Sequence, residues 1–197
     1  MLVLASQSAA RRSLLAMAGV QHEAVTAHVD EEAAKQSLLA ASTAPRDVAD
    51  AIAQLKAVKI SQARPTDMVL GCDSIVVLEN GTLLSKPASR EDAAQQLHQM
   101  ANSRHQLISA AVIAESGRPT WRAVDVVHMT VRPLSAAFID DYLEAEWPAI
   151  AGCVGCYRIE GRGVQLFSAI QGSHFTILGL PILPLLAHLR ARGEMLV

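Results

Sequence analysis

The sequence predicts an α/β fold in which helices flank a mixed, twisted β-sheet around a central cleft. Apolar runs typical of strands alternate with amphipathic helical patterns, which favours parallel strands joined by crossover helices. The dipeptide Asn80-Gly81 between two apolar runs predicts a hairpin, which is antiparallel. Apolar residues make up 51% of 197 positions. We therefore expect a single domain over residues 1–197, built as one body or as two lobes around the cleft.

The first third of the chain contains two strand patterns and two helical patterns. Residues 1–5 are an apolar strand, and a helical pattern with Ser8 as its N-cap follows. Residues 23–29 form a short strand that ends at a cluster of acidic residues. Residues 45–62 are rich in alanine and have apolar side chains at helical spacing, and Pro45 is tolerated in a first turn.

The remaining elements follow from turn and cap signals. Residues 68–78 are a strongly apolar run that Gly71-Cys72-Asp73-Ser74 interrupts, and the hairpin covers residues 76–84. Ser89, with an acidic residue at capping-box spacing, begins a helix that ends near Met100. The other expected elements are strands at 106–114, 123–131 and 164–170, and helices at 135–147 and 181–192.

Composition excludes several classes of function. A net charge of −2 weighs against general nucleic-acid binding, which needs a basic surplus. No apolar run approaches the ~20 residues of a membrane span, and the first residues lack the basic region of a signal peptide. Three cysteines do not make a disulfide framework. We expect a cytoplasmic protein without a nucleic-acid or membrane partner.

Residues 1–15 combine a strand, a hydroxyl-rich turn and a basic helix start. Backbone N–H groups at a helix N-terminus are unpaired and carry partial positive charge. Ser6, Ser8 and Arg11 at this point therefore suggest a binding site for an anion such as phosphate. The same pattern also suits an ordinary strand–helix unit in which Ser8 only caps the helix.

Asp73 is the sharpest single candidate for chemistry because it lies inside an apolar run. A desolvated carboxylate is costly unless it meets a cation or hydrogen-bond donors, so a metal ligand, a general base or both would explain it. A turn aspartate after Gly71 is the alternative. Glu31, between two other acids, offers a second carboxylate, although clustered acids usually form a solvated face.

Two lysines complete a pattern suited to phosphate chemistry. Lys56 lies in a helix of apolar and small residues, and Lys86 follows the hairpin. Each alone suits a surface position. With two carboxylates and an arginine they match metal-assisted attack on phosphorus, in which a divalent ion bridges phosphate oxygens and cations absorb negative charge. Cys153 and Cys156 leave a thiol redox protein as an alternative, which would require a thiol with a lowered pKa.

Seven short motifs carry a family resemblance. They run in order along nearly the whole chain: Leu4-Ala5-Ser6-x-Ser8-x-x-Arg11-Arg12-x-Leu14-Leu15, Asp30-Glu31, Leu55-Lys56-Ala57, Gly71-x-Asp73-Ser74, Lys86-Pro87, Glu160-Gly161-x-Gly163 and Gly179-Leu180-Pro181. Each is weak alone, but the ordered set is specific. Together they resemble the Maf family of nucleoside triphosphate pyrophosphatases.

The resemblance implies an inosine triphosphatase-like α/β fold, a Mg²⁺ or Mn²⁺ cofactor and a homodimer. It implies cleavage of a nucleoside triphosphate to a monophosphate and pyrophosphate, which cleanses the nucleotide pool. Asp73 would be the catalytic base and a metal ligand, and Glu31 would help to hold the metal. The residues that would contact the triphosphate are Ser6, Ser8, Arg11, Lys56 and Lys86.

The positions that would recognise the base are Ala10, Ser74 and Glu160. The segment Cys153–Gly161 looks closer to the family's 7-methyl-GTP branch than to its dTTP and UTP branch, and Glu160 would accept hydrogen bonds from a guanine edge. That branch carries a tryptophan and a glutamine where this chain has Ala10 and Ser74. Without the tryptophan, a stacking surface for a positively charged methylated purine is missing.

The family is also linked to the arrest of cell division, so a nucleotide-binding regulator without turnover is the competing hypothesis. Such a regulator would need the anion site but not Asp73. A panel of nucleotides with Mg²⁺ and detection of pyrophosphate separates the two.

Overall fold

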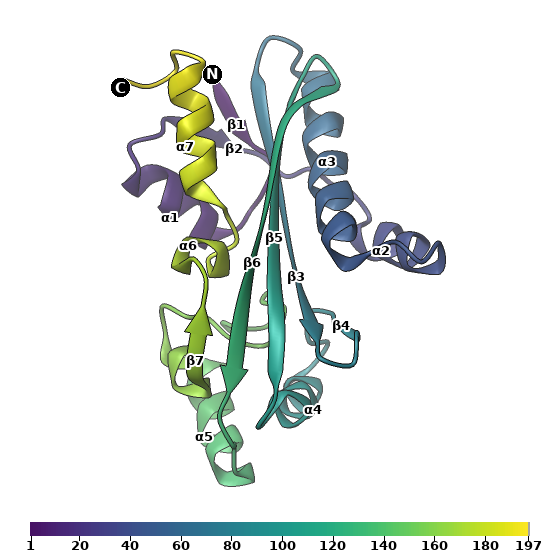
Figure 1. Ribbon diagram of the computed structural model, residues 1–197, viewed down its shortest axis with the longest axis vertical. Coiled ribbons are helices and arrows are strands. Elements are labelled where there is room, and N and C mark those ends of the chain that lie inside the picture. The colour runs from purple at the N-terminus through teal and green to yellow at the C-terminus, as the bar shows by residue number, and fades with distance from the viewer. Residues whose placement is uncertain (197) are drawn as a thin grey trace. The chain divides into compact units, whose positions relative to one another are not determined.

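The computed structural model describes residues 1–196 (Figure 1). Within them, a mixed sheet of seven strands is flanked by helices, which confirms the predicted fold class. The sheet order is β2-β1-β3-β5-β6-β7, and β4 pairs with β3. The strands are β1 (Leu2–Leu4), β2 (His22–Ala24), β3 (Met68–Leu78), β4 (Leu83–Leu84), β5 (Arg104–Glu115), β6 (Arg118–Val131) and β7 (Phe167–Gln171). The helices are α1 (Ala9–Met17), α2 (Glu31–Ala40), α3 (Pro45–Ala63), α4 (Arg90–Met100), α5 (Ala136–Glu146), α6 (His174–Ile177) and α7 (Ile182–Ala191), with a 3₁₀ helix at Arg162–Leu166.

The chain divides into two compact units. Unit 1 comprises Met1–Ser74, Ile108–Asp125 and the described residues from Ser173 on, and unit 2 comprises Ile75–Leu107 and Val126–Gly172. In the described part of the chain, no helix combines the length and the apolar character needed to cross a membrane.

Unit 1 is built around β1, which pairs in parallel with β2 and β3. Because side chains alternate along a strand, β1 serves two cores. Leu2 and Leu4 pack in a cluster with buried leucines of α1 and α7, whereas Val3 and Ala5 pack on the other face, where Ile60 of α3 joins them. Figure 1 shows α1 and α7 on one side of these strands and α3 on the other.

Strand β3 runs without a break through the residues that we expected to interrupt it, so the alternative of a turn aspartate after Gly71 is wrong. Gly71 serves close packing instead. A Cβ atom at this position would lie 2.1 Å from the carbonyl oxygen of Ala53 and 2.7 Å from the amide nitrogen of Ala57. The glycine therefore lets α3 lie directly on β3, beside Asp73.

Unit 2 contains the hairpin and the two helices whose serine caps were predicted. Val76 pairs with Leu84 in the antiparallel ladder of β3 and β4. The Oγ atoms of Ser89 and Ser135 accept hydrogen bonds from the first turns of α4 and α5.

Two expected strands are shorter in the structure than in the prediction, and one helix is additional. The strand expected at 23–29 is only β2, because its partner β1 offers three residues for pairing. Helix α2 was not expected, and Asp30 caps it by accepting a hydrogen bond from the amide of Ala33. The strand expected at 164–170 begins at Phe167, because the preceding residues form the 3₁₀ helix.

Candidate active site

The start of α1 presents hydroxyl groups and one cation, as the sequence predicts. Ser8 is the N-cap, and its Oγ accepts a hydrogen bond from the amide of Arg11 at 3.4 Å. The Oγ of Ser6 accepts a hydrogen bond from the amide of Ser8 at 3.3 Å. Ala10 is half-buried in the same turn. This end of the helix can therefore receive an anion while Ser8 also acts as its cap.

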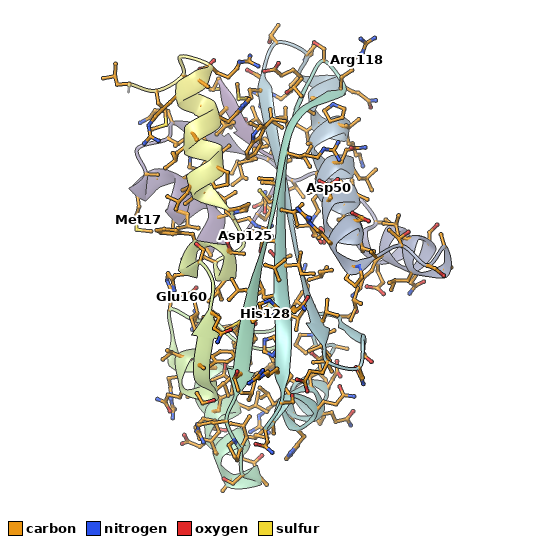
Figure 2. All side chains as sticks on the ribbon, viewed as in Figure 1. Met17, Asp50, Arg118, Asp125, His128 and Glu160 are labelled. Carbon is orange, nitrogen blue, oxygen red and sulfur yellow. The ribbon has the colours of Figure 1, made fainter. Side chains whose placement is uncertain are left out.

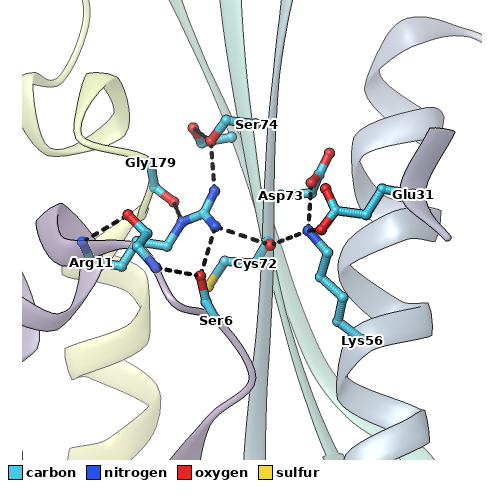
Figure 3. Close-up of polar contacts among 10 residues, drawn as sticks. Ser6, Arg11, Glu31, Lys56, Cys72, Asp73, Ser74 and Gly179 are labelled. Carbon is cyan, nitrogen blue, oxygen red and sulfur yellow. Dashed lines mark hydrogen bonds and ion pairs between the residues drawn. The ribbon is translucent and has the colours of Figure 1, made fainter. Parts of the chain in front are cut away.

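The guanidinium of Arg11 is held by groups from three other segments (Figure 3). Its Nε donates to the carbonyl oxygen of Gly179 at 2.8 Å, and its Nη2 donates to Ser74 Oγ at 3.0 Å. Its Nη1 donates to Ser6 Oγ at 3.1 Å and to the carbonyl oxygen of Cys72 at 3.3 Å. A guanidinium carries five N–H donors, so these four bonds fix its orientation and leave one donor, on Nη2, for a further ligand within the described residues.

Lys56 joins the two candidate carboxylates. Its Nζ lies 2.8 Å from Asp73 Oδ1 and 3.0 Å from Glu31 Oε1, and it donates to the carbonyl oxygen of Cys72 at 3.3 Å. Figure 3 shows this carbonyl between the Lys56 ammonium and the Arg11 guanidinium. One backbone oxygen thus holds both cations on the strand that carries Asp73.

Asp73 is paired with a cation, the Lys56 ammonium, as its position in an apolar run requires. Only 7% of the residue is exposed, and this burial raises the pKa of its carboxyl. Lys56 opposes the rise by its charge and its hydrogen bond, Arg11 opposes it by its charge, and the charge of Glu31 adds to it. A carboxyl with a raised pKa is a better proton acceptor once ionised than an exposed aspartate.

The donor set fits a hard divalent cation that also binds substrate. Within residues 1–196, no group of three or more His, Cys, Asp or Glu side chains gathers that could hold a metal ion. Mg²⁺ is commonly bound by one or two carboxylates together with substrate phosphates. The carboxylates of Glu31 and Asp73 supply such a pair, because an oxygen of each lies within hydrogen-bond distance of Lys56 Nζ.

Eight of the ten predicted site residues lie in unit 1, and the two others, Lys86 and Glu160, belong to unit 2. Both are exposed and lie within electrostatic reach of Cys153. Burial raises the pKa of the Cys153 thiol, Glu160 raises it further, and Arg158 and Lys86 lower it. The charges of Lys86 and Glu160 therefore act in opposite directions on the same half-buried thiol.

The segment that carries Glu160, which Figure 2 labels, is held by the buried acid Glu146. Glu146 Oε2 lies 2.8 Å from Arg158 Nη2, and Oε1 accepts a hydrogen bond from the amide of Arg162 at 3.2 Å. A Cβ atom on Gly163 would lie 2.4 Å from the carbonyl oxygen of Arg158. The glycine and the ion pair together close the loop from which Glu160 projects.

The two cysteines of the C-x-x-C motif do not have the properties of a redox pair. All three cysteines of the chain are free thiols. Burial raises the pKa of Cys156 to about 12, and the Cys156 thiol donates to Gln96 Oε1 at 3.3 Å. Redox thiols need a lowered pKa, so the geometry argues against the thiol redox hypothesis.

Sequence reasoning missed two groups at this site. The Cys72 carbonyl has no signal in the sequence, because any residue carries one. The hydroxyl of Ser109, on β5, lies 2.8 Å from Ser74 Oγ, and a lone serine in an apolar run gave no reason to select it.

Comparison with known proteins identifies the family of this chain. A model of the Maf-like protein family matches residues 1–192. A nucleoside triphosphate pyrophosphatase of Sphingopyxis alaskensis is 50% identical over 98% of this chain and 97% of its own length. One of Roseobacter denitrificans is 47% identical over 98% and 97%. A 7-methyl-GTP pyrophosphatase of Brucella suis is 43% identical over 96% and 94%. The resemblance read from the seven motifs is thereby confirmed, and the chain belongs to the Maf family.

Proposed function

We propose that this protein hydrolyses a nucleoside triphosphate between its α and β phosphates, releasing a nucleoside monophosphate and pyrophosphate. The observation that carries the proposal is the cluster around the Cys72 carbonyl, where Lys56 and Arg11 converge beside Asp73. Phosphoryl transfer needs positioning and charge stabilisation more than a covalent nucleophile, and this cluster offers both. The names of the relatives from Sphingopyxis and Roseobacter support the same activity.

In the proposed mechanism, Asp73 orients a water and accepts its proton as the oxygen attacks phosphorus. Arg11 donates to the triphosphate with its remaining N–H, and Ser6 and Ser8 present the α1 terminus to the same anion. Lys56 keeps the acid pair neutralised, and a contact from its ammonium to the triphosphate would replace its bond to the Cys72 carbonyl. Lys86 is proposed as a further triphosphate contact.

Glu31 and Asp73 would hold a divalent cation, Mg²⁺ or Mn²⁺. When bound, such an ion supplies charge neutralisation for the phosphate oxygens and lowers the pKa of a coordinated water. Removal of divalent cations with EDTA is expected to abolish pyrophosphate release, and added Mg²⁺ or Mn²⁺ to restore it.

We propose 7-methyl-GTP as the first nucleotide to test. The relative from Brucella suis carries that substrate in its name, and Glu160 offers a carboxylate that accepts hydrogen bonds from a guanine edge. Ala10 and Ser74 are the other proposed specificity positions. We also propose that the protein acts as a homodimer in the cytoplasm, and light scattering after size-exclusion chromatography tests the dimer.

The decisive experiment is a nucleotide panel with Mg²⁺ in which pyrophosphate release is measured. Asp73→Asn is expected to abolish turnover while the variant remains folded. Asp47→Asn, an exposed aspartate in the first turn of α3, is the matched control and should keep the activity. Turnover near the wild-type rate in a folded Asp73→Asn variant would remove Asp73 from the mechanism. Nucleotide binding without pyrophosphate release from any nucleotide would favour the non-catalytic regulator.

A further inference from the structure

We propose that Ser109 is a positioning residue for Arg11, acting through a chain of two hydroxyl groups that ends at α6. The inference rests on the proposed function in one respect, namely that the ligand of Arg11 is a triphosphate. Ser109 is 0% exposed and belongs to none of the seven family motifs. Its Oγ lies 2.8 Å from Ser74 Oγ and 2.8 Å from the carbonyl oxygen of Thr176.

The hydrogens in this chain can be assigned from its two ends. A guanidinium only donates, so Arg11 Nη2 donates to Ser74 Oγ. A carbonyl only accepts, so Ser109 donates to Thr176. Each hydroxyl carries one hydrogen, and Ser74 must therefore donate to Ser109. Ser74 consequently turns a lone pair toward Arg11 and has no hydrogen left to donate to a nucleotide.

The far end of the chain is anchored on β6. Thr176 Oγ1 donates to Asp125 Oδ2 at 2.5 Å, and Figure 2 labels Asp125 on that strand. The Thr176 carbonyl also accepts a hydrogen bond from the amide of Gly179 at 3.0 Å. Gly179 in turn accepts from Arg11 Nε. The turn after α6 thus reaches Arg11 twice, directly through Gly179 and indirectly through Ser109 and Ser74.

This double attachment determines where the last N–H of Arg11 points. Deleting the Ser109 hydroxyl leaves the Ser74 hydrogen without its acceptor. Ser74 can then rotate, and its lone pairs are no longer directed at Arg11 Nη2. The guanidinium gains freedom that it must lose when a triphosphate binds, and this loss weakens binding.

The test measures the dissociation constant of inorganic tripolyphosphate by calorimetry with Mg²⁺, and kcat/KM for the nucleotide that the panel identifies. Ser109→Ala is expected to weaken tripolyphosphate binding about tenfold and to lower kcat/KM similarly. The matched control is Ser61→Ala, because Ser61 is equally buried in unit 1 and bonds to Val58 and Gly117 instead. Ser74→Ala breaks the same chain at a half-buried position and should reproduce the loss if Ser109→Ala folds poorly.

A double-mutant cycle separates positioning from general damage. In an Arg11→Ala background, Ser109→Ala should cause no further loss of tripolyphosphate binding, whereas a purely structural defect would cause the same loss in both backgrounds. Equal losses in both backgrounds, or a loss no larger than that of Ser61→Ala, would overturn the proposal. The calorimetric measurement does not need turnover, so an inactive wild-type enzyme would contradict the proposed hydrolysis and leave the test of Ser109 intact.

Discussion

The ammonium of Lys56 lies 2.8 Å from a carboxylate oxygen of Asp73, and both residues are buried, at 5% and 7% exposure. Burial is the largest cause of the raised pKa of Asp73, and Lys56 is the strongest group that opposes this rise. Removing one partner of a buried ion pair leaves an uncompensated charge, which costs far more than the intact pair contributes. The ionisation state of Asp73 therefore depends on Lys56, which also supplies positive charge to the site.

Replacing Lys56 by methionine is expected to destabilise the protein most at neutral and alkaline pH. Without Lys56, the pKa of Asp73 rises further above its value in the unfolded chain. A raised carboxyl pKa gives stability that is present at low pH and lost as pH rises through the folded-state value. The free energy of unfolding, from urea titrations, should fall by about 3 kcal/mol near pH 8 and by less near pH 5.

The control for this change is Lys59→Met, which alters the next lysine along α3. Lys59 is exposed and donates to the carbonyl oxygen of His28, so its loss should alter stability little at either pH. A loss of stability in Lys56→Met that is independent of pH would show that the lysine does not control the ionisation of Asp73.

Gly71→Ala is expected to destabilise the protein and to lower its activity together. The added Cβ would lie 2.1 Å from the carbonyl oxygen of Ala53, so α3 must move away from β3. Overpacking of this kind costs about 3 kcal/mol or more when backbone is the obstacle. Because Lys56 lies on α3 between the two contact points, its bond to Asp73 should lengthen. Urea unfolding and pyrophosphate release measure the two effects.

Gly152→Ala is the control, since a Cβ there meets nothing within 4 Å. It should leave both stability and activity near the wild-type values. A Gly71→Ala variant as stable as Gly152→Ala would mean that α3 does not need its close contact with β3.

The sequence was sufficient to predict a structural feature where the signal for that feature is local. Ser8, Ser89 and Ser135 were recognised as caps because the residue types and their spacing carry the geometry. Pro45 marked the first turn of α3 for the same reason. Asp73 and Lys56 could each be selected from the sequence, because each is a polar residue in apolar surroundings. The bond between them could not be predicted, because it joins two segments that only the fold brings together.

Other features could not be predicted, or were missed although a signal was present. Helix α2 has an N-cap aspartate and two glutamates in its first turn, which together are a recognisable signal for the start of a helix. Gly71 resembled a turn residue, because the sequence does not show that a helix lies on the strand there. Ser109 has a partner 67 residues away, so no local pattern could identify it.

Acid is expected to destabilise the protein partly through His105. The Tyr157 hydroxyl donates to Met129 Sδ and so accepts from His105 Nε2, which leaves the buried Nδ1 without a hydrogen-bond partner in the described residues. Burial lowers the pKa of His105 to about 4. A lowered folded-state pKa gives stability that is present above the unfolded value of about 6.5 and lost as pH falls toward 4.

His105→Phe should therefore flatten the fall in unfolding free energy between about pH 7 and pH 4.5, a contribution on the order of 3 kcal/mol in the wild type. Phenylalanine keeps a ring beside Tyr157 and Phe167, which contact His105. The exposed His128 on β6 provides the control variant His128→Phe, whose pH dependence should match the wild type. An unchanged slope in His105→Phe would exclude His105 as the titrating group.

Glu160→Gln is expected to change which base is preferred without changing the chemistry of the phosphates. A carboxylate offers two acceptor oxygens to the N–H groups of a guanine edge, whereas an amide keeps one acceptor and places an NH₂ donor where the other oxygen was. A site built to accept hydrogen bonds from these N–H groups binds the matching base much more weakly when a donor replaces one of its acceptors. The kcat/KM for 7-methyl-GTP should fall about 10- to 100-fold, and that for dTTP or UTP should stay within about twofold.

The control is Glu144→Gln, which changes an exposed acid on α5 and should leave every kcat/KM ratio unchanged. Because Glu160 is exposed and Glu146 holds its loop, the fold should tolerate the change. An equal loss for all bases would instead place Glu160 among the groups that serve the triphosphate.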